Sequence, residues 1–288
     1  MNTQVVKEKQ DLTYLSWSVF RSSSGTAGSF MKSYIRSSSG TAGTFLKAES
    51  TISGKKVYYK LSNFDKIHGV VGHECVNELV VDRLLTILDI PHLQYQLIHA
   101  DILVDGRVHD VYLSASEDFK ERGESKIALD VYKEREAFEN ESSLEFCLRL
   151  GWEEYIYQML VVDYLILNRD RHGANMEVLR NNGKKSLRPA PLFDHGVSLL
   201  YSCVNDKEVQ DFDVTKDLPC NNFIGSKSTW ENLSLIPKNK MPKLNPLKES
   251  DKAIIFENLD GIISEKLSEK MWKMIWKRWC TYEDFCNS

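Results

Sequence analysis

The sequence predicts an α+β protein of two lobes, a small β-rich amino-terminal lobe followed by a mainly helical carboxy-terminal lobe. Strand and hairpin patterns with one helical pattern occupy residues 1–119, whereas helical patterns dominate residues 120–288. The 288 residues are enough to bury a core in each lobe. We therefore expect two domains that meet near residue 119, with a shared site between them.

The strands of the first half are indicated by β-branched and aromatic residues between turn signals. The earliest covers Lys55–Leu61. Leu93–Leu103 and Arg107–Ala115 follow, joined at Asp105-Gly106, a strong signal for a two-residue hairpin turn. Apolar residues at helical spacing predict an amphipathic helix over Gly72–Leu88.

The second half begins with a charged connector, Ser116–Asn140, that contains short helical pieces. Helices are expected over Ser142–Leu150 and Trp152–Leu167, and the second is nearly all apolar and therefore buried. Strands over Met176–Arg180 and Ser186–Phe193 flank Asn182-Gly183, a second hairpin signal.

The end of the chain is expected to be irregular and then helical. Leu200–Leu247 carries most of the prolines, and Lys248–Cys286 has the pattern of two or three helices. Trp272, Trp276 and Trp279 recur at spacings of four and three, hence on one helical face. Core packing explains them better than a binding platform.

A Ser/Gly-rich segment occurs twice, as Arg21–Lys32 and again as Arg36–Lys47. Such a loop offers backbone N–H groups and hydroxyls to phosphate oxygens, although a flexible linker has the same composition. Of the two copies, the second is expected to cover the phosphates of a bound ligand. A hairpin that turns near Ser53-Gly54 would place the strand with Lys60 close behind this copy, whereas the first copy lies 15 residues further away. The predicted phosphate-binding residues are Ser38, Ser39, Gly40, Thr41, Ala42 and Gly43.

Two short acidic motifs carry the strongest functional signal. Asp170 precedes Asn175 by five residues, and Asp194 follows an apolar strand in Asp-His-Gly. The hairpin between the motifs should make Asn175 and Asp194 neighbours that supply oxygen ligands to magnesium. Asp170 would accept a hydrogen bond from a substrate hydroxyl, so the set indicates phosphoryl transfer. A surface loop of capping and turn residues is the alternative.

Phosphoryl transfer from a nucleotide needs a cation near the phosphates, and we expect Lys60 to supply it. Side chains alternate along a strand, so Lys60 can point under the Ser/Gly loop. Lys47 is a rival, but it stands only four residues after Gly43, too close to the loop to reach back. A carboxylate usually orients such a lysine, and Glu74 and Glu78 lie one turn apart on one face of the following helix. Glu78 is the preferred partner, with Glu74 as a solvated alternative.

Adenine needs a backbone edge and an apolar slot. The strand that ends at Ser116 runs into Glu117 and Phe119, where the β-rich half gives way to the connector. We expect Ser116, Glu117 and Phe119 to form a hinge against the base, although a simple strand end has the same sequence.

Two histidines suggest another enzyme class, a metal-dependent hydrolase built from Asp170, His172, Asp194 and His195. Their spacing fits no common zinc pattern. We therefore expect His172 to brace the catalytic loop instead.

The motif Asn168-x-Asp170-x-His172-x-x-Asn175, followed by Ala190-Pro-Leu-Phe-Asp194, resembles the HipA-like serine/threonine kinases. These are toxin kinases of bacterial toxin–antitoxin systems and related secreted effector kinases. The resemblance runs from about Arg36 to Leu200 and includes Lys60 and Asn77-Glu78. It implies a bilobal protein-kinase-like fold and a serine/threonine kinase that depends on ATP and Mg²⁺.

The resemblance also implies the role of each site residue. Asp170 would be the catalytic base, Asn175 and Asp194 would bind magnesium, and Lys60 would contact the phosphates. Family members can autophosphorylate a serine of the phosphate loop, which turns the kinase off. The candidate phosphosites are Ser37, Ser38 and Ser39. The sequence differs from the longer toxins in two ways. Its loop is Ser-rich and duplicated, and about 35 residues stand before the second copy where those toxins have an amino-terminal subdomain.

The implied partners are a protein substrate and, for a toxin, a cognate antitoxin. A formal net charge of −4 argues against nucleic-acid binding by bulk positive charge.

Three observations bear on the location. The first residues lack the apolar core of a signal peptide, and the apolar stretch Met159–Leu167 is too short to span a bilayer. The six scattered cysteines suit a reducing compartment. A cytoplasmic location is expected, which an effector exported by a specialised system would share. A catalytically inactive binding module and a lipid kinase similar to phosphatidylinositol kinases are the alternative functions.

Overall fold

The computed structural model describes residues 4–18 and 45–287. Both copies of the Ser/Gly segment fall almost wholly outside these ranges. The predicted phosphate-loop residues and the phosphosites Ser37, Ser38 and Ser39 therefore lie outside the described residues.

A five-stranded sheet forms the amino-terminal lobe, in the order β1-β6-β7-β3-β2. The strands are β1 (Val5–Asp11), β2 (Lys47–Ile52), β3 (Lys55–Leu61), β6 (Gln96–Val104) and β7 (Arg107–Glu117). β1 pairs in parallel with β6, and the other pairs are antiparallel. Strand β1 was not predicted, because it lies at the edge of the sheet and exposes most of its polar side chains.

The two hairpins expected in this lobe are confirmed. Strands β2 and β3 turn at Ser53-Gly54, and β6 and β7 turn at Asp105-Gly106. All four turn residues have positive φ, as the mirror-image two-residue turns require. The local dipeptides thus set the register of both strand pairs.

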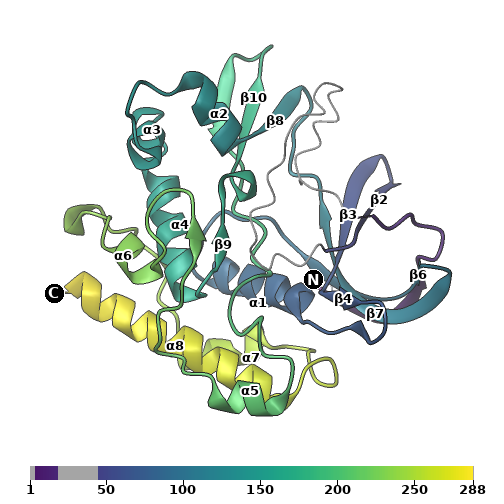
Figure 1. Cartoon of the computed structure of the whole chain (residues 1–288). Helices are drawn as coiled ribbons and strands as arrows, with labels where there is room; N and C mark the ends of the chain where they lie inside the picture. Colours follow the sequence, from purple (N-terminus) through teal and green to yellow (C-terminus); the bar gives the residue numbers. More distant parts are fainter. Residues whose placement is uncertain (1–3, 19–44, 288) are drawn as a thin grey trace.

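Helix α1 (Glu74–Ile87) packs against β3, β6 and β7 on one side and against α7 (Lys252–Ile255) on the other. It matches the predicted range, but it is not amphipathic. Its residues from Glu74 to Leu85 are buried all round, because the helix lies between the sheet and the carboxy-terminal helices. Figure 1 shows it at the junction of the two lobes.

The carboxy-terminal lobe is mainly helical. It contains α2 (Leu129–Glu136), α3 (Ser143–Arg149), α4 (Glu153–Leu165), α5 (Asp206–Asp211), α6 (Thr229–Leu233) and α8 (Glu265–Asn287), with short 3-10 turns. The buried core is built around α4 and α8 (Figure 1). Trp272 and Trp279 are buried in it and Trp276 stacks on Trp272, so the expected packing role of the tryptophans is confirmed.

Small sheets complete this lobe. β8 (Glu124–Ala128), β10 (Glu177–Asn181) and β11 (Ser186–Pro189) form one, and β9 (Asp170–Arg171) pairs with β12 (Asn221–Asn222) in another. A third pair, β4 (Phe64–Asp65) and β5 (Gly69–Val70), precedes α1. The connector over residues 116–140 was predicted without a strand, and β8 corrects this, because pairing with β10 orders its polar Glu-Ser-Lys start. The region 200–247 was predicted to be irregular but contains α5 and α6.

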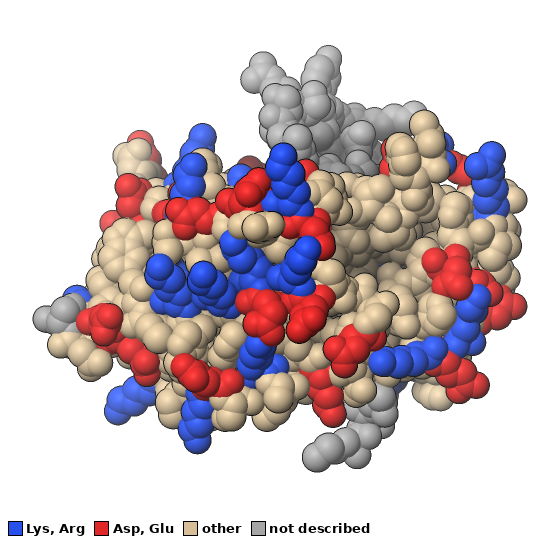
Figure 2. All heavy atoms as spheres, turned by 90° about the horizontal axis from the view of Figure 1, so that it is seen from below, with Lys and Arg blue, Asp and Glu red and all other residues tan. Residues whose placement is uncertain are grey.

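The bilobal α+β, kinase-like architecture predicted from the sequence is confirmed. The expected boundary at Phe119–Lys120 falls between β7 and β8, and we retain it as a proposal. Among the helices that the structure describes, none combines the length and the apolar character needed to cross a bilayer. On the face shown in Figure 2, the described basic and acidic side chains are intermingled.

Candidate active site

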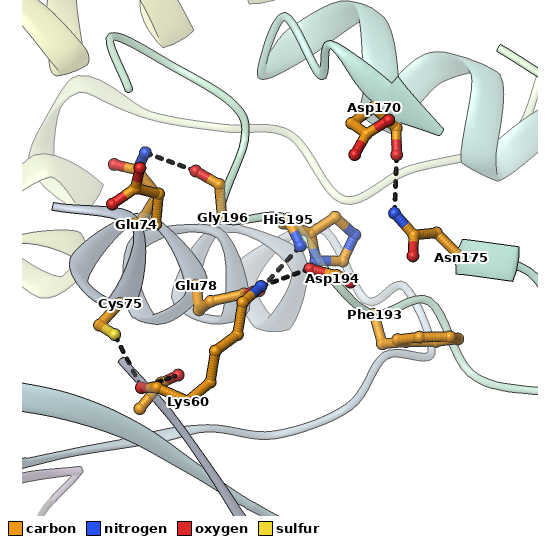
Figure 3. Close-up of polar contacts among 12 residues, drawn as sticks. Lys60, Glu74, Cys75, Glu78, Asp170, Asn175, Phe193, Asp194, His195 and Gly196 are labelled. Atoms are coloured by element: carbon orange, nitrogen blue, oxygen red, sulfur yellow. Dashed lines mark hydrogen bonds and ion pairs between the residues drawn. The ribbon is translucent and has the colours of Figure 1, made fainter. Parts of the chain in front are cut away.

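The β10–β11 hairpin returns the chain to its starting point, so that Asn175 and Asp194 lie at its two ends. Figure 3 shows Asp194 between Lys60 on one side and the pair Asp170 and Asn175 on the other. Four residues from β3, β9, a 3-10 turn and the segment after β11 thus face one region. The turn itself is longer than predicted, since Lys185 rather than Asn182-Gly183 takes the left-handed conformation.

Lys60 bridges two carboxylates. Its Nζ donates to Glu78 Oε1 at 3.1 Å and to Asp194 Oδ1 at 2.5 Å. The Glu78 side chain is 1% exposed and the Lys60 side chain 13%. Burial lowers the pKa of Lys60, but the charges of Asp194 and Glu78 outweigh it and raise that pKa, so the lysine is a cation.

Of the two glutamates considered for Lys60, Glu78 makes the contact. Glu74 was expected to be solvated, but it is 4% exposed and its carboxylate accepts the backbone N–H of Asn63 at 3.0 Å. It stabilises the turn after β3, which positions the strand that carries Lys60.

The Asp-His-Gly segment is held by α1. Glu78 Oε2 accepts the backbone N–H of His195 at 2.8 Å, and the Asn77 amide donates to the carbonyls of Gly196 and Ser198 at 2.9 and 3.0 Å. A Cβ at Gly196 would lie 3.3 Å from Glu78 Oε1, so glycine permits this close approach.

Asp194 itself adopts a left-handed backbone conformation, with φ of 58°. Its N–H donates to the hydroxyl of Tyr95 at 3.2 Å. Burial raises the pKa of the Asp194 carboxyl, but the nearby Lys60 and Lys47 ammonium groups lower it below its ordinary value. Asp194 is therefore an anion that is ion-paired with Lys60.

Asp170 is held by its backbone while its carboxylate stays accessible. Its N–H donates to Asn168 Oδ1 at 3.1 Å, and its carbonyl accepts from Asn175 Nδ2 at 2.8 Å. The side chain is 27% exposed. Burial and the charge of Asp194 raise the pKa of Asp170, which His172 lowers in part. A carboxylate in this position can accept a proton.

The brace of this loop is Arg171, which sequence reasoning missed. The Arg171 side chain is 1% exposed; Nη2 pairs with Asp163 at 2.9 Å, and Nη1 donates to the carbonyls of Phe193 and Asn175 at 2.9 and 3.3 Å. One guanidinium therefore ties α4 to both acidic motifs. The signal was a lone Asp163 in an apolar helix, which needs a buried partner.

His172, which was predicted to brace the catalytic loop, has a partly exposed side chain next to Asp170. Its side chain is 39% exposed, and Nε2 is 3.7 Å from Asp170 Oδ2. The ring therefore lies at the rim, next to Asp170. The ring of His195 is buried, and burial and nearby cations lower its pKa well below the ordinary value. Across residues 4–18 and 45–287, no group of three or more His, Cys, Asp and Glu side chains is arranged to hold a metal ion.

Lys47 also reaches the site, although it was set aside on its distance from the loop. It pairs with Lys60 in the β2–β3 register, so the two side chains share a face of the sheet. Burial lowers its pKa, which the charges of Asp194, Glu78 and Glu177 raise in part. The hairpin, rather than the loop, sets its position.

The residues expected at the hinge lie at the end of β7 and just after it. Ser116 pairs with Tyr58 in the sheet, and Glu117 points outward to Lys55 at 2.7 Å. Phe119 packs on Phe193, the residue before Asp194, with ring centroids 5.5 Å apart. Of these three residues, Phe119 is therefore the one that packs against the residue before Asp194.

Comparisons with known proteins bear on the fold. The structure is similar to that of the proinflammatory kinase CtkA of Helicobacter pylori, with a TM-score of 0.53 and 16% identity over 81% of this chain and 89% of that one. It is also similar to a chain of the HipA–HipB toxin–antitoxin complex with operator DNA from Shewanella oneidensis MR-1, with a TM-score of 0.40 and 16% identity, covering 83% of this chain and 56% of that one.

No protein-family model matches the sequence, and no curated protein matches it. At 16% identity, the similarity to CtkA shows a shared fold. The kinase-like fold expected from the motifs is thereby confirmed.

Proposed function

We propose that the protein is an ATP- and Mg²⁺-dependent serine/threonine protein kinase. The observation that carries this proposal is the bridge from Lys60 Nζ to Glu78 and Asp194, beside the Asp170–Asn175 loop. A buried lysine held by a carboxylate of the helix, next to a second carboxylate, is the arrangement that phosphoryl transfer requires.

Each residue has a role in this proposal. Lys60 contacts the nucleotide phosphates. Asp194 and Asn175 would hold magnesium, which would neutralise phosphate charge; the Nδ2 of Asn175 donates to the Asp170 carbonyl, and its Oδ1 would be the oxygen for the cation. Asp170 accepts the proton of the attacking hydroxyl, the new bond forms from that oxygen to the γ-phosphorus, and ADP leaves.

The Ser/Gly loop completes the proposal. We assign Ser38–Gly43 to the phosphates and Ser37–Ser39 to autophosphorylation, which would oppose ATP binding through added negative charge. Ser116, Glu117 and Phe119 would border the base. A protein substrate, and an antitoxin if the chain is a toxin, would be the partners of a cytoplasmic or exported kinase.

The test uses the full chain with labelled ATP and Mg²⁺. Asp170→Asn should reduce transfer at least about 100-fold and change ATP affinity less than about threefold, because Asp170 meets the acceptor rather than the nucleotide. The exposed Glu154→Gln, on α4, is the matched control. Wild-type turnover in Asp170→Asn would refute the assigned base.

The same reactions separate the alternatives. An inactive binding module would bind ATP without transferring phosphate in the wild type. A lipid kinase would label phosphatidylinositol vesicles and leave protein unlabelled. Peptide mapping of the labelled chain should find phosphate on Ser37–Ser39, and phosphate confined to Ser22–Ser24 would contradict the choice of the second copy.

A further inference from the structure

Glu177 is a buried carboxyl group to which the proposed chemistry assigns no role. It is 2% exposed, and neither Oε1 nor Oε2 has a hydrogen-bond partner among the residues that the structure describes. Burying such a group without a hydrogen-bond donor costs free energy. A ligand that supplies a donor at this position should therefore bind more tightly than one that does not.

The strand geometry aims Glu177 between the lobes. Side chains alternate along β10, so Glu177 and Leu179 share one face. Leu179 packs in one buried cluster with Phe193, against which Phe119 also packs. This face of β10 therefore looks toward the hinge and toward the residue before Asp194.

The charges around Glu177 come from both lobes. Lys126 of β8 pairs with Asp118 at 2.6 Å and lies 4.0 Å over the Phe119 ring. Burial raises the pKa of Glu177 to about 7, with Lys126 and Lys47 acting to lower it and Asp118 to raise it. Lys126 stands on the hinge side, and Lys47 comes from the amino-terminal sheet.

Lys47 links Glu177 to the phosphate-binding end of the site. The negative charges of Asp194 and Glu177 both raise the pKa of its ammonium group. Glu177 and Asp194 are therefore both within electrostatic range of Lys47, which lies opposite Lys60 in the β2–β3 pair. A nucleotide with its phosphates at Lys60 and Asp194, and its base at the hinge, has that base near Glu177.

We propose that Glu177 selects the nucleobase, its carboxyl accepting a hydrogen bond from the exocyclic amino group of a purine nucleoside triphosphate. This inference rests on the proposed function. Adenine carries such a group at position 6 and guanine at position 2. A site built to bond an amino group rejects an analogue that lacks it, because the buried acceptor then stays unpaired.

The experiment measures the affinity of the full chain for four triphosphates in two matched pairs. ATP is compared with purine riboside triphosphate, which lacks only the 6-amino group, and GTP with inosine triphosphate, which lacks only the 2-amino group. In the wild type, one pair should differ about 10- to 100-fold, the range expected for a hydrogen bond to a charged group. That pair identifies the base.

Two substitutions connect the effect to this residue. Glu177→Leu, apolar like the neighbouring Leu179, should bring the ratio in that pair close to one. Glu177→Gln keeps an acceptor oxygen but carries no charge, so it should retain a smaller ratio of about 3- to 10-fold. Glu154→Gln should leave it unchanged.

Equal affinity within both pairs in the wild type would overturn the inference, even if Glu177→Leu failed to fold. An unchanged ratio in folded Glu177→Leu would also overturn it. If none of the four triphosphates bound the wild type, the proposed nucleotide-dependent function would itself be wrong, a result distinct from binding without discrimination.

Discussion

The stability of Glu177→Gln relative to the wild type should increase from acidic to alkaline pH. The carboxyl has an ordinary pKa of 4.5 and, in the folded chain, one of about 7. Between these values the folded state binds more protons than the unfolded state, so the stability of the wild type falls as the pH rises. Gln cannot ionise, and the variant avoids this loss.

The magnitude follows from the two pKa values. One unit of pKa corresponds to about 1.36 kcal/mol, so the full loss above pH 7 is about 3 kcal/mol. Between pH 5 and pH 8, Glu177→Gln should therefore gain about 2–3 kcal/mol over the wild type in free energy of unfolding.

Urea denaturation followed by tryptophan fluorescence at pH 5 and pH 8 measures this gain, provided that the urea dependence of the free energy is the same in both chains. Glu154→Gln, an exposed carboxylate, is the control and should change by less than about 0.5 kcal/mol. A gain below about 0.5 kcal/mol for Glu177→Gln, or a gain at pH 5 instead, would refute the reasoning.

Two further changes test the supports of the site. Arg171→Met should lower the free energy of unfolding by about 3–5 kcal/mol, because Asp163 is left as a buried charge without its counterion. Urea denaturation measures the change. A double variant with Asp163→Leu should recover part of the loss, because it removes the lone charge but leaves the Asn168 amide without its acceptor. Asn77→Ala removes the donors to the Gly196 and Ser198 carbonyls and should cost about 2 kcal/mol while slowing phosphate transfer. Unchanged stability and transfer in Asn77→Ala would show that α1 does not hold the Asp-His-Gly segment through this amide.

Turn chemistry and local spacing account for what the sequence determined. Gly54, Gly106 and Asp105 adopt positive φ angles that their residue types favour, so two hairpins could be predicted from their turn dipeptides. The stretch from Asn168 to Asn175 is short and holds only β9 and a 3-10 turn. Its Asp and Asn side chains were expected at one end of the β10–β11 hairpin, because short connections keep neighbours close in space.

The tertiary structure decided which distant side chains meet. Glu74 and Glu78 are equivalent in sequence, and only the packing of α1 against β3 turns Glu78 toward Lys60. Lys47 enters the site through the register of β2 with β3, which no local pattern around the loop contains.

The pairing of Arg171 with Asp163 and the unpaired burial of Glu177 depend equally on long-range packing. A charge on an apolar helix or strand shows that a partner is required, but its identity depends on which elements come together. The sequence by itself therefore determined the hairpins and the acidic motifs. The folded chain determined the partners of the buried charges, because their energies arise only once water is excluded.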